Sequence, residues 1–302
     1  MALAPVRSMR IAVFRPLGLG EVLQMVPALR ALDAAYPAAH ITLVGAARAR
    51  PLALRLRRYV DSYLEFPGFP GIPGPANLNA LPGFFDQARA ARFDLALQMQ
   101  GSGELANPLI VLMGAARTAG HYRFGRFCPD PRRYLPWRDE ESEVDRSLRL
   151  VGHLGAPAKG TQLEFPLYEG DLRDAGRFGA DGHALLHPDA GPGASWTPAR
   201  FAELGDALAA EGLPVALTGT AGSGALTRAV KEAMREPALD LAGRTALGSF
   251  GALVMRARLM VTAHPGVAVL AAATRTPAVL IAPGATLHDA LQDIARALAC
   301  AA

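Results

Sequence analysis

The segment from Met9 to Pro27, MRIAVFRPLGLGEVLQMVP, constrains the fold of this chain more than any other stretch. It begins with a continuous apolar run, Ile11 to Phe14, which is typical of a central strand that is covered on both faces of a parallel sheet. A glycine turn follows, and from Val22 the apolar residues recur at helical spacing. A strand, a glycine turn and a helix in succession predict the first unit of an open α/β sheet.

The turn after this strand is a candidate ligand site, because open α/β sheets bind ligands at the carboxyl ends of their strands. Gly18 and Gly20 permit a tight turn and the close approach of a ligand to the backbone. Glu21 falls in the first turn of the predicted helix. The pattern alone leaves two interpretations open: a functional carboxylate, or an acid that complements the helix dipole.

The same order of elements returns in the second half of the chain. A predicted strand at Ala184–His187 leads into the glycine-rich loop 188–196, and Thr197-Pro198 supplies a helix N-cap with proline at the first helical position. We therefore predict an α/β protein with two facing, doubly wound, Rossmann-like lobes. The expected boundaries are 1–158 and 159–285, with a final helix, 286–302, that packs back on the first lobe through its apolar stripe, which is formed by Leu287, Leu291, Ile294 and Leu298.

The composition narrows the class of protein. Hydrophobic residues make up 51% of the 302 residues and charged residues 19%, which is typical of a globular chain. The formal net charge of +4 disfavours nucleic acid as a partner. Without a long uncharged apolar run we expect no membrane span, and without an apolar leader we expect a cytoplasmic protein. The mild positive charge is compatible with a position peripheral to the inner membrane. Cys128 and Cys300 are isolated, so neither a metal site nor a disulfide is predicted.

Polar residues follow further predicted strands at the same kind of edge. In the first lobe the apolar run FDLAL, residues 93–97, turns polar at Gln98, Gln100 and Gly101. In the second lobe, helix starts are expected after Pro188, Thr218 and His264, and helix N-termini bind phosphate. This arrangement favours a phosphorylated ligand, but every α/β sheet has loops at this edge, and neither GxGxxG nor a P-loop lysine motif occurs.

The segment FPGFPGIPGP, residues 66–75, is too rich in proline and glycine for a helix or a central strand. We expect a surface loop at the same edge as Glu21. It either covers an acceptor site or is a plain connector.

Taken together, several segments resemble glycosyltransferase family 9, the heptosyltransferase family, over nearly the whole chain. They are residues 11–37, FDLALQMQG with the later RTAGH, HPDAGPGASWTPARFAELGDAL, LTGTAG, residues 240–277, and VLIAPG. The resemblance implies a GT-B fold with the acceptor on the first lobe and the nucleotide sugar on the second. It also implies inverting, metal-independent transfer, usually of heptose from an ADP-sugar to a lipopolysaccharide core or another sugar-bearing acceptor, with no cofactor.

The resemblance also implies roles for individual residues. Glu21 falls on the position of the family's catalytic acid and would act as the general base. Acceptor binding is expected of Arg15, Gly18, Gly20, Gln98, Gln100 and Gly101. Donor binding is expected of His187, Asp189, Ser195, Thr218, Thr245, Thr262, His264 and Gly266.

The donor side departs from the family pattern. Ala194 stands where the family has a phosphate-binding lysine, and His264-Pro265-Gly266 stands where it has Asp-Thr-Gly. An alternative therefore remains open: a degenerate, non-catalytic member of the family that binds a glycan, a nucleotide or a protein partner.

Overall fold

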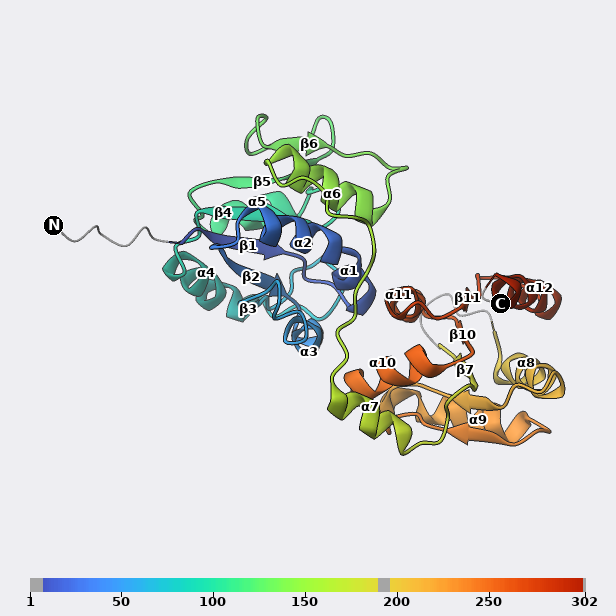
Figure 1. Ribbon diagram of the computed structural model, residues 1–302. Coiled ribbons are helices and arrows are strands. Elements are labelled where there is room, and N and C mark those ends of the chain that lie inside the picture. Colours follow the sequence, from blue (N-terminus) through green and yellow to red (C-terminus); the bar gives the residue numbers. More distant parts are fainter. Residues whose placement is uncertain (1–7, 190–195, 301–302) are drawn as a thin grey trace. The chain divides into compact units, whose positions relative to one another are not determined.

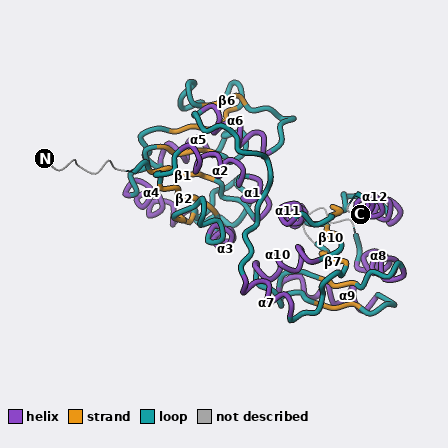
Figure 2. The backbone as a smooth tube through the Cα atoms, viewed as in Figure 1, coloured by secondary structure: helices purple, strands orange, loops and turns teal. Residues whose placement is uncertain are grey.

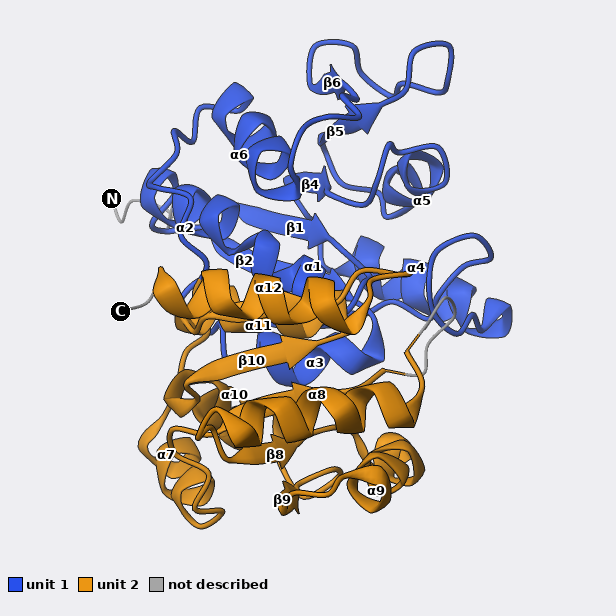
Figure 3. Ribbon diagram, turned by 90° about the vertical axis from the view of Figure 1, so that its right-hand side faces the viewer, with its two compact units in different colours: residues 1–163 blue, residues 164–302 orange. Residues whose placement is uncertain are grey.

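The computed structural model describes residues 8–189 and 196–300. The chain divides into two compact units, Met1–Leu163 and Glu164–Ala302 (Figure 3). The boundary lies about five residues beyond the expected one, which was between residues 158 and 159. Each unit contains one parallel sheet with helices on both faces, so the chain has the two-lobed, Rossmann-like architecture of the GT-B fold.

The sheet of unit 1 has six parallel strands. In spatial order they are β3 (Ser62–Glu65), β2 (His40–Gly45), β1 (Arg10–Phe14), β4 (Leu95–Gln98), β5 (Thr118–Tyr122) and β6 (Tyr134–Pro136). The four residues Ile11 to Phe14 are fully buried, as expected for the central strand of a doubly wound sheet. The strand order reverses between β1 and β4, and ligands of such sheets bind at this switch point.

The helices of unit 1 cover both faces of this sheet (Figures 1 and 2). They are α1 (Leu19–Gln24), α2 (Val26–Ala35), α3 (Arg50–Ala53), α4 (Leu81–Ala90), α5 (Ala106–Leu112) and α6 (Glu143–His153), with short 3-10 turns at Ala47–Ala49 and Leu78–Ala80. One core forms where Ala12 and Phe14 of β1 contact residues of α4 and α5, including Phe84 and Ile110. Side chains alternate along a strand, so Ile11 and Val13 face the opposite side.

The sheet of unit 2 has five parallel strands in an equivalent order. They are β11 (Ala278–Leu280), β10 (Leu259–Thr262), β7 (Ala184–His187), β8 (Val215–Leu217) and β9 (Ala238–Asp240). Here the order reverses between β7 and β10. The predicted strand at Ala184–His187 is therefore the central strand of its sheet, as β1 is in unit 1.

The helices of unit 2 also form two layers. They are α7 (Glu169–Gly176), α8 (Pro198–Ala210), α9 (Gly224–Ala233), α10 (Leu247–Arg256), α11 (Pro265–Thr274) and α12 (Leu287–Ala299), with a 3-10 turn at Ala221–Ser223. Figure 1 shows α7 and α10 on one side of β7 and β10, with α8 and α12 on the other. The predicted N-cap Thr197 is confirmed, because its side chain accepts a hydrogen bond from the backbone N–H of Arg200.

The final helix differs from its predicted position. Ala290 and Ile294 of α12 are buried in the core of unit 2, together with Leu208 of α8 and Val279 of β11. The stripe Leu287, Leu291 and Leu298 packs against the same core. This stripe therefore has a partner surface within its own unit, and the predicted contact of the helix with the first lobe stays a prediction.

Two smaller differences lie in unit 1. The predicted helix from Val22 is two helices, because the chain turns at Met25 between α1 and α2. The edge strand β6, which pairs with β5 from Gly120 to Tyr122, was not predicted.

Candidate functional site

The Glu21 carboxylate lies beside the glycine turn that follows β1. A Cβ built on Gly18 would lie 3.4 Å from Oε2 of Glu21 and 3.6 Å from Nε of Arg48, so an acid and a guanidinium flank this glycine. Gly18 is also the N-cap of α1, and it provides no side-chain cap. Among the described residues, no ion pair engages Glu21. Its carboxylate is therefore free to accept a proton from a ligand at this edge.

A cavity of about 390 Å³ opens next to these residues at the carboxyl ends of β1, β2 and β3. Its walls include Pro16 after β1, Arg48 after β2 and Glu65 at the end of β3. The proline-glycine loop supplies the remaining wall, from Phe66 to Pro75. Arg48 is fixed against this loop, since its Nη2 donates a hydrogen bond to the carbonyl of Pro73 at 3.3 Å. The loop thus borders a cavity at the edge that carries Glu21.

A second cavity, of about 170 Å³, lies at the carboxyl end of β4. It is lined by the predicted residues Gln100 and Gly101, and by Gly71 and Ile72 of the proline-glycine loop. Ile72 lines both cavities. The Oε1 atom of Gln100 is buried and has no hydrogen-bond partner among the described residues, so it retains one unused acceptor.

Two predicted acceptor-binding residues, Arg15 and Gln98, are buried and form their hydrogen bonds inside unit 1. Arg15 is buried; it donates to the carbonyl of Met99 and pairs with Glu143 at 2.6 Å. Gln98 is fully buried; its amide group donates to the carbonyl of Gln100, and its Oε1 accepts from the backbone N–H of His121 at 3.2 Å. Both side chains make their hydrogen bonds within unit 1, and acceptor binding by either one stays a prediction. Their role is to hold the turns that follow β1 and β4.

A polar network behind this edge joins β5 to α6. Glu143 also pairs with Arg146, whose guanidinium carbon lies 3.7 Å from the centre of the Trp137 ring. Burial, with the nearby positive charges of Arg149 and Arg146, lowers the pKa of His121 to about 3. His121 is therefore neutral at physiological pH, and its Nε2 has no hydrogen-bond partner among the described residues.

In unit 2 the predicted donor residues meet at the carboxyl ends of β7, β8 and β10. Nδ1 of His187 lies 3.0 Å from the hydroxyl of Thr218, which in turn donates to the carbonyl of Leu186. Thr262 accepts a hydrogen bond from the backbone N–H of His264 at 2.9 Å. Thr218 and Thr262 are almost fully buried. Both hydroxyls contact the two histidines, and their direct contact with a donor stays a prediction.

His264 is the exposed member of this group and caps a helix. Its Nδ1 accepts the backbone N–H of Gly266 at 3.1 Å, so His264 is the N-cap of α11. An acceptor Nδ1 places the hydrogen of the neutral ring on Nε2. This histidine therefore presents an N–H donor at a helix N-terminus, where an anion is favoured.

The ring of His187 is enclosed by aromatic neighbours. Its centroid lies 5.6 Å from that of Phe250 on α10 and 6.3 Å from that of His264. Burial, with the effect of His264, lowers the pKa of His187 to about 4, although the charge of Asp189 opposes this shift. The half-buried Thr245 lies in the loop before α10. The predicted donor residue Ser195 and the neighbouring Ala194 lie outside the described residues.

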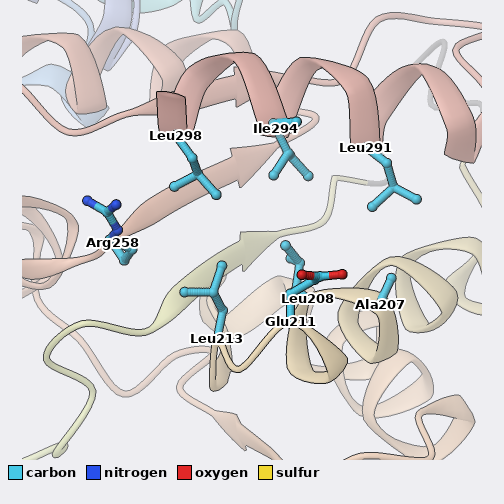
Figure 4. A pocket seen from close by; sticks show the side chains of 9 residues that line it. Ala207, Leu208, Glu211, Leu213, Arg258, Leu291, Ile294 and Leu298 are labelled. Carbon is cyan, nitrogen blue, oxygen red and sulfur yellow. The ribbon is translucent and has the colours of Figure 1, made fainter. Parts of the chain in front are cut away.

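A larger cavity of unit 2, about 550 Å³, has a different character (Figure 4). It lies between α8 and α12, and its walls are mainly apolar, with Leu208, Leu291 and Ile294 facing it. Leu213 and Arg258 precede β8 and β10, so this cavity lies at the amino ends of the strands. It is therefore distinct from the edge that brings His187 and His264 together.

Sequence reasoning missed three residues near these edges. Arg48 lies in the basic segment ARAR directly after β2, a signal that the sequence contains. His121 belongs to the RTAGH segment, but no role was inferred for it. Phe250 gave no signal, because one aromatic residue in an apolar helix is typical of a core.

In residues 8–189 and 196–300, no helix is long and apolar enough to cross a membrane. The same residues contain no group of three or more His, Cys, Asp or Glu side chains that could hold a metal ion.

Comparisons with known proteins identify relatives of this fold. A glycosyl transferase family 9 structure from Veillonella parvula DSM 2008 matches with a TM-score of 0.71 and 21% identity, covering 90% of this chain and 80% of that one. The E. coli ADP-heptose LPS heptosyltransferase II matches with a TM-score of 0.68 and 21% identity, covering 97% and 99%. The E. coli heptosyltransferase WaaC with ADP matches with a TM-score of 0.69 and 19% identity, covering 97% and 100%.

No curated protein sequence matches this chain. The sequence model described as glycosyltransferase family 9 (heptosyltransferase), however, matches residues 84–286, which is more than half of the chain. The protein therefore belongs to glycosyltransferase family 9, the heptosyltransferase family.

Proposed function

We propose that this glycosyltransferase moves a heptose-like sugar from an ADP-sugar to a glycan, a lipopolysaccharide core or another sugar-bearing acceptor, with inversion and without a metal ion. The observation that carries this proposal is the Glu21 carboxylate, which makes no ion pair among the described residues and flanks Gly18 together with Arg48, a residue that lines the adjacent cavity. Support for the donor comes from the solved relatives, one named as an ADP-heptose enzyme and another as a complex with ADP.

In the proposed mechanism, Glu21 acts as the general base. It takes the proton of an acceptor hydroxyl while that oxygen attacks the anomeric carbon of the donor. The bond from the anomeric carbon to the diphosphate oxygen breaks, and the diphosphate leaves with its electron pair. Attack on the side opposite the leaving group inverts the anomeric configuration.

The developing charge on the leaving diphosphate needs fixed donors. In unit 2 these are the Nε2–H group of His264 and the N-terminus of α11. His187 is neutral and buried, so it positions His264 through ring contact and contributes no positive charge.

The test compares two carboxylates that line or border the same cavity. We expect Glu21→Gln to lower kcat by about 100-fold to 10,000-fold, because the amide cannot accept the proton. Glu65→Gln is the matched control; Glu65 lines the cavity, but its carboxylate lies 3.6 Å from Arg50. The assay measures release of ADP from ADP-heptose with an acceptor, and NMR of the product reports the anomeric configuration.

Unchanged turnover in Glu21→Gln would remove this residue from the mechanism. A chelator should leave the rate unchanged, since no step uses a metal.

A non-catalytic binding protein is the second candidate. It is favoured by one observation: Ala194 stands where the family has a phosphate-binding lysine, so the residues clustered on the donor side are histidines and threonines, namely His187, Thr218, Thr262 and His264. For this candidate, wild-type protein would bind ADP without consuming ADP-sugar in the presence of any acceptor.

A further inference from the structure

The cavity of about 390 Å³ next to Glu21 has mainly apolar walls. The loop that forms much of this wall, residues 66–80, contains no charged residue. Four prolines line the cavity, namely Pro16, Pro67, Pro73 and Pro75. Sites for small molecules typically have volumes of about 300 to 1,000 Å³ and apolar walls with a few polar groups that fix the orientation of the ligand. The cavity next to Glu21 has both properties.

The apolar wall is held in place by contacts within unit 1. The ring of Phe66 packs edge-on against that of Phe14 on β1, with 5.1 Å between the ring centroids. Ile72 is buried in the same core. The backbone N–H of Asn77 donates to the carbonyl of Pro67 at 2.9 Å and so joins the two ends of the loop. Because the wall is formed without a ligand, binding against it costs little conformational entropy.

The charges that line or border this cavity balance one another. Arg48 and Glu65 line it. The carboxylate of Glu65 lies 3.6 Å from Nε of Arg50, and Arg48 flanks Gly18 together with Glu21. Two guanidinium groups therefore stand beside two carboxylates. The cavity offers no excess of either charge to a ligand.

This balance disfavours a charged ligand group. A phosphate or carboxylate that approached Arg48 would also approach the carboxylate of Glu21, and like charges repel. A charged group would also lose hydration against the apolar wall. An uncharged group with an apolar face meets neither cost, and it gains free energy because apolar surface is removed from water.

We propose that the acceptor presents an uncharged, apolar aglycone to this cavity, while the sugar that carries the reacting hydroxyl lies at Glu21. This inference rests on the proposed function and narrows its acceptor to one chemical class. That class is a neutral glycoside with an aromatic or aliphatic aglycone, in contrast to a phosphorylated or acidic saccharide.

The test measures acceptor binding by titration calorimetry with the purified full-length protein and no donor. The probes are methyl, phenyl and 4-carboxyphenyl glycosides, each prepared with glucose, galactose and mannose. For at least one sugar, we expect the phenyl glycoside to bind about ten-fold to a hundred-fold more tightly than the methyl glycoside. The 4-carboxyphenyl glycoside should bind about ten-fold more weakly than the phenyl glycoside, because its carboxylate enters a cavity without excess positive charge.

Two variants with opposite effects locate the aglycone. Asn77→Lys adds a positive charge at an exposed lining position and should tighten binding of the 4-carboxyphenyl glycoside about ten-fold, with little change for the phenyl glycoside. Asn79→Lys is the matched control, since Asn79 is exposed on the same loop but does not line the cavity. Ala47→Trp, at another exposed lining position, should fill the cavity and weaken binding of the phenyl glycoside at least ten-fold, but not that of the methyl glycoside.

Three results would overturn the proposal. The first is that no phenyl glycoside binds more tightly than its methyl counterpart, which includes the case of no measurable binding. The second is that the 4-carboxyphenyl glycoside binds as tightly as the phenyl glycoside. The third is an equal effect of Asn77→Lys and Asn79→Lys.

Failure of this inference can be distinguished from failure of the proposed function. None of the titrations contains a donor, so a protein that transfers no sugar can still show the expected binding ratios. Conversely, a protein that transfers sugar to charged acceptors releases ADP from ADP-heptose without showing these ratios.

Discussion

At the scale of single residues, each unit buries one imidazole that is neutral at physiological pH. His121 on β5 has a pKa lowered to about 3, and His187 on β7 has a pKa lowered to about 4, in both cases mainly by burial. An unfolded histidine titrates near 6.5. Acidification therefore favours unfolding, because the unfolded chain can take up protons that the folded units cannot.

For His187, these pKa values give the direction in which pH changes the free energy of unfolding and the pH range of that change. Between pH 6.5 and about 4 the unfolded state binds a proton that the folded state does not, so the free energy of unfolding rises with pH across this window. The stability that the folded protein gains from a neutral His187 is complete above pH 6.5 and is lost as the pH falls toward 4. It amounts to about 3 kcal/mol, since one pKa unit corresponds to about 1.4 kcal/mol.

We expect His187→Gln to flatten the pH dependence of unfolding in this window by close to one proton. Urea unfolding at a series of pH values, followed by the fluorescence of Trp196 in the same unit, measures the slope. His288→Gln, at an exposed position on α12, is the control and should keep the wild-type slope. An unaltered slope in His187→Gln would show that this ring binds its proton over the same pH range in the folded and unfolded states, so that folding does not lower its pKa.

Residue roles at the sheet edges were only partly predictable. The sequence placed Glu21, Gln98 and His264 correctly at carboxyl edges, because a strand followed by a polar turn determines the edge. It did not distinguish side chains that face a ligand from those that form hydrogen bonds with backbone groups of the protein. Gln98 donates to Gln100 and accepts from His121, and nothing in the apolar run before it distinguishes that use from ligand binding.

At the scale of elements, α11 shows how a departure from the family pattern is accommodated. The resemblance implies Asp-Thr-Gly where this chain has His264-Pro265-Gly266. His264 nevertheless caps the helix through Nδ1, and Pro265 occupies the first helical position, where its missing N–H is not needed. The helix N-terminus is thus retained with an imidazole cap in place of a carboxylate.

The cap can be tested apart from any activity. His264→Ala should lower the free energy of unfolding of unit 2 by about 1 kcal/mol, because the N–H of Gly266 loses its acceptor. His264→Asn, which can cap through its side-chain oxygen, should retain most of the wild-type stability. Urea unfolding at constant pH, followed by Trp196, makes the comparison. Equal losses in both variants would mean that packing, and not the hydrogen bond, is what His264 contributes.

Helices and strands were predictable where the local pattern of apolar and capping residues determines them. The buried strands β1 and β7 and the helix α8 were found from apolar runs and from an N-cap followed by proline. The strand β6 was not, since Tyr134–Pro136 is short and becomes a strand only by pairing with β5. The packing of α12 on the core of unit 2 was not found for a related reason: an apolar stripe requires a partner surface but does not identify it.

At the scale of the whole molecule, the two units have separate cores, and each contains one of the two tryptophans. Ile110 of α5 is fully buried in the unit 1 core with Phe14 and Phe84. Ile294 of α12 is buried in the unit 2 core with Leu208 and Val279. Trp137 lies in unit 1 and Trp196 in unit 2, so one native reporter is available for each core.

Truncation of either isoleucine should therefore destabilise only one unit. Ile294→Ala leaves a cavity between α12 and the sheet of unit 2 and should cost about 2 to 5 kcal/mol there. Ile110→Ala, the matched truncation in unit 1, should cost a similar amount in its own unit.

With Trp137→Phe or Trp196→Phe as background, denaturant unfolding follows one unit at a time. We expect Ile294→Ala to shift only the Trp196 transition and Ile110→Ala only that of Trp137, because each cavity removes contacts from one core. If each truncation shifts both transitions equally, the chain unfolds as a single cooperative body, and its stability cannot be divided between the two cores.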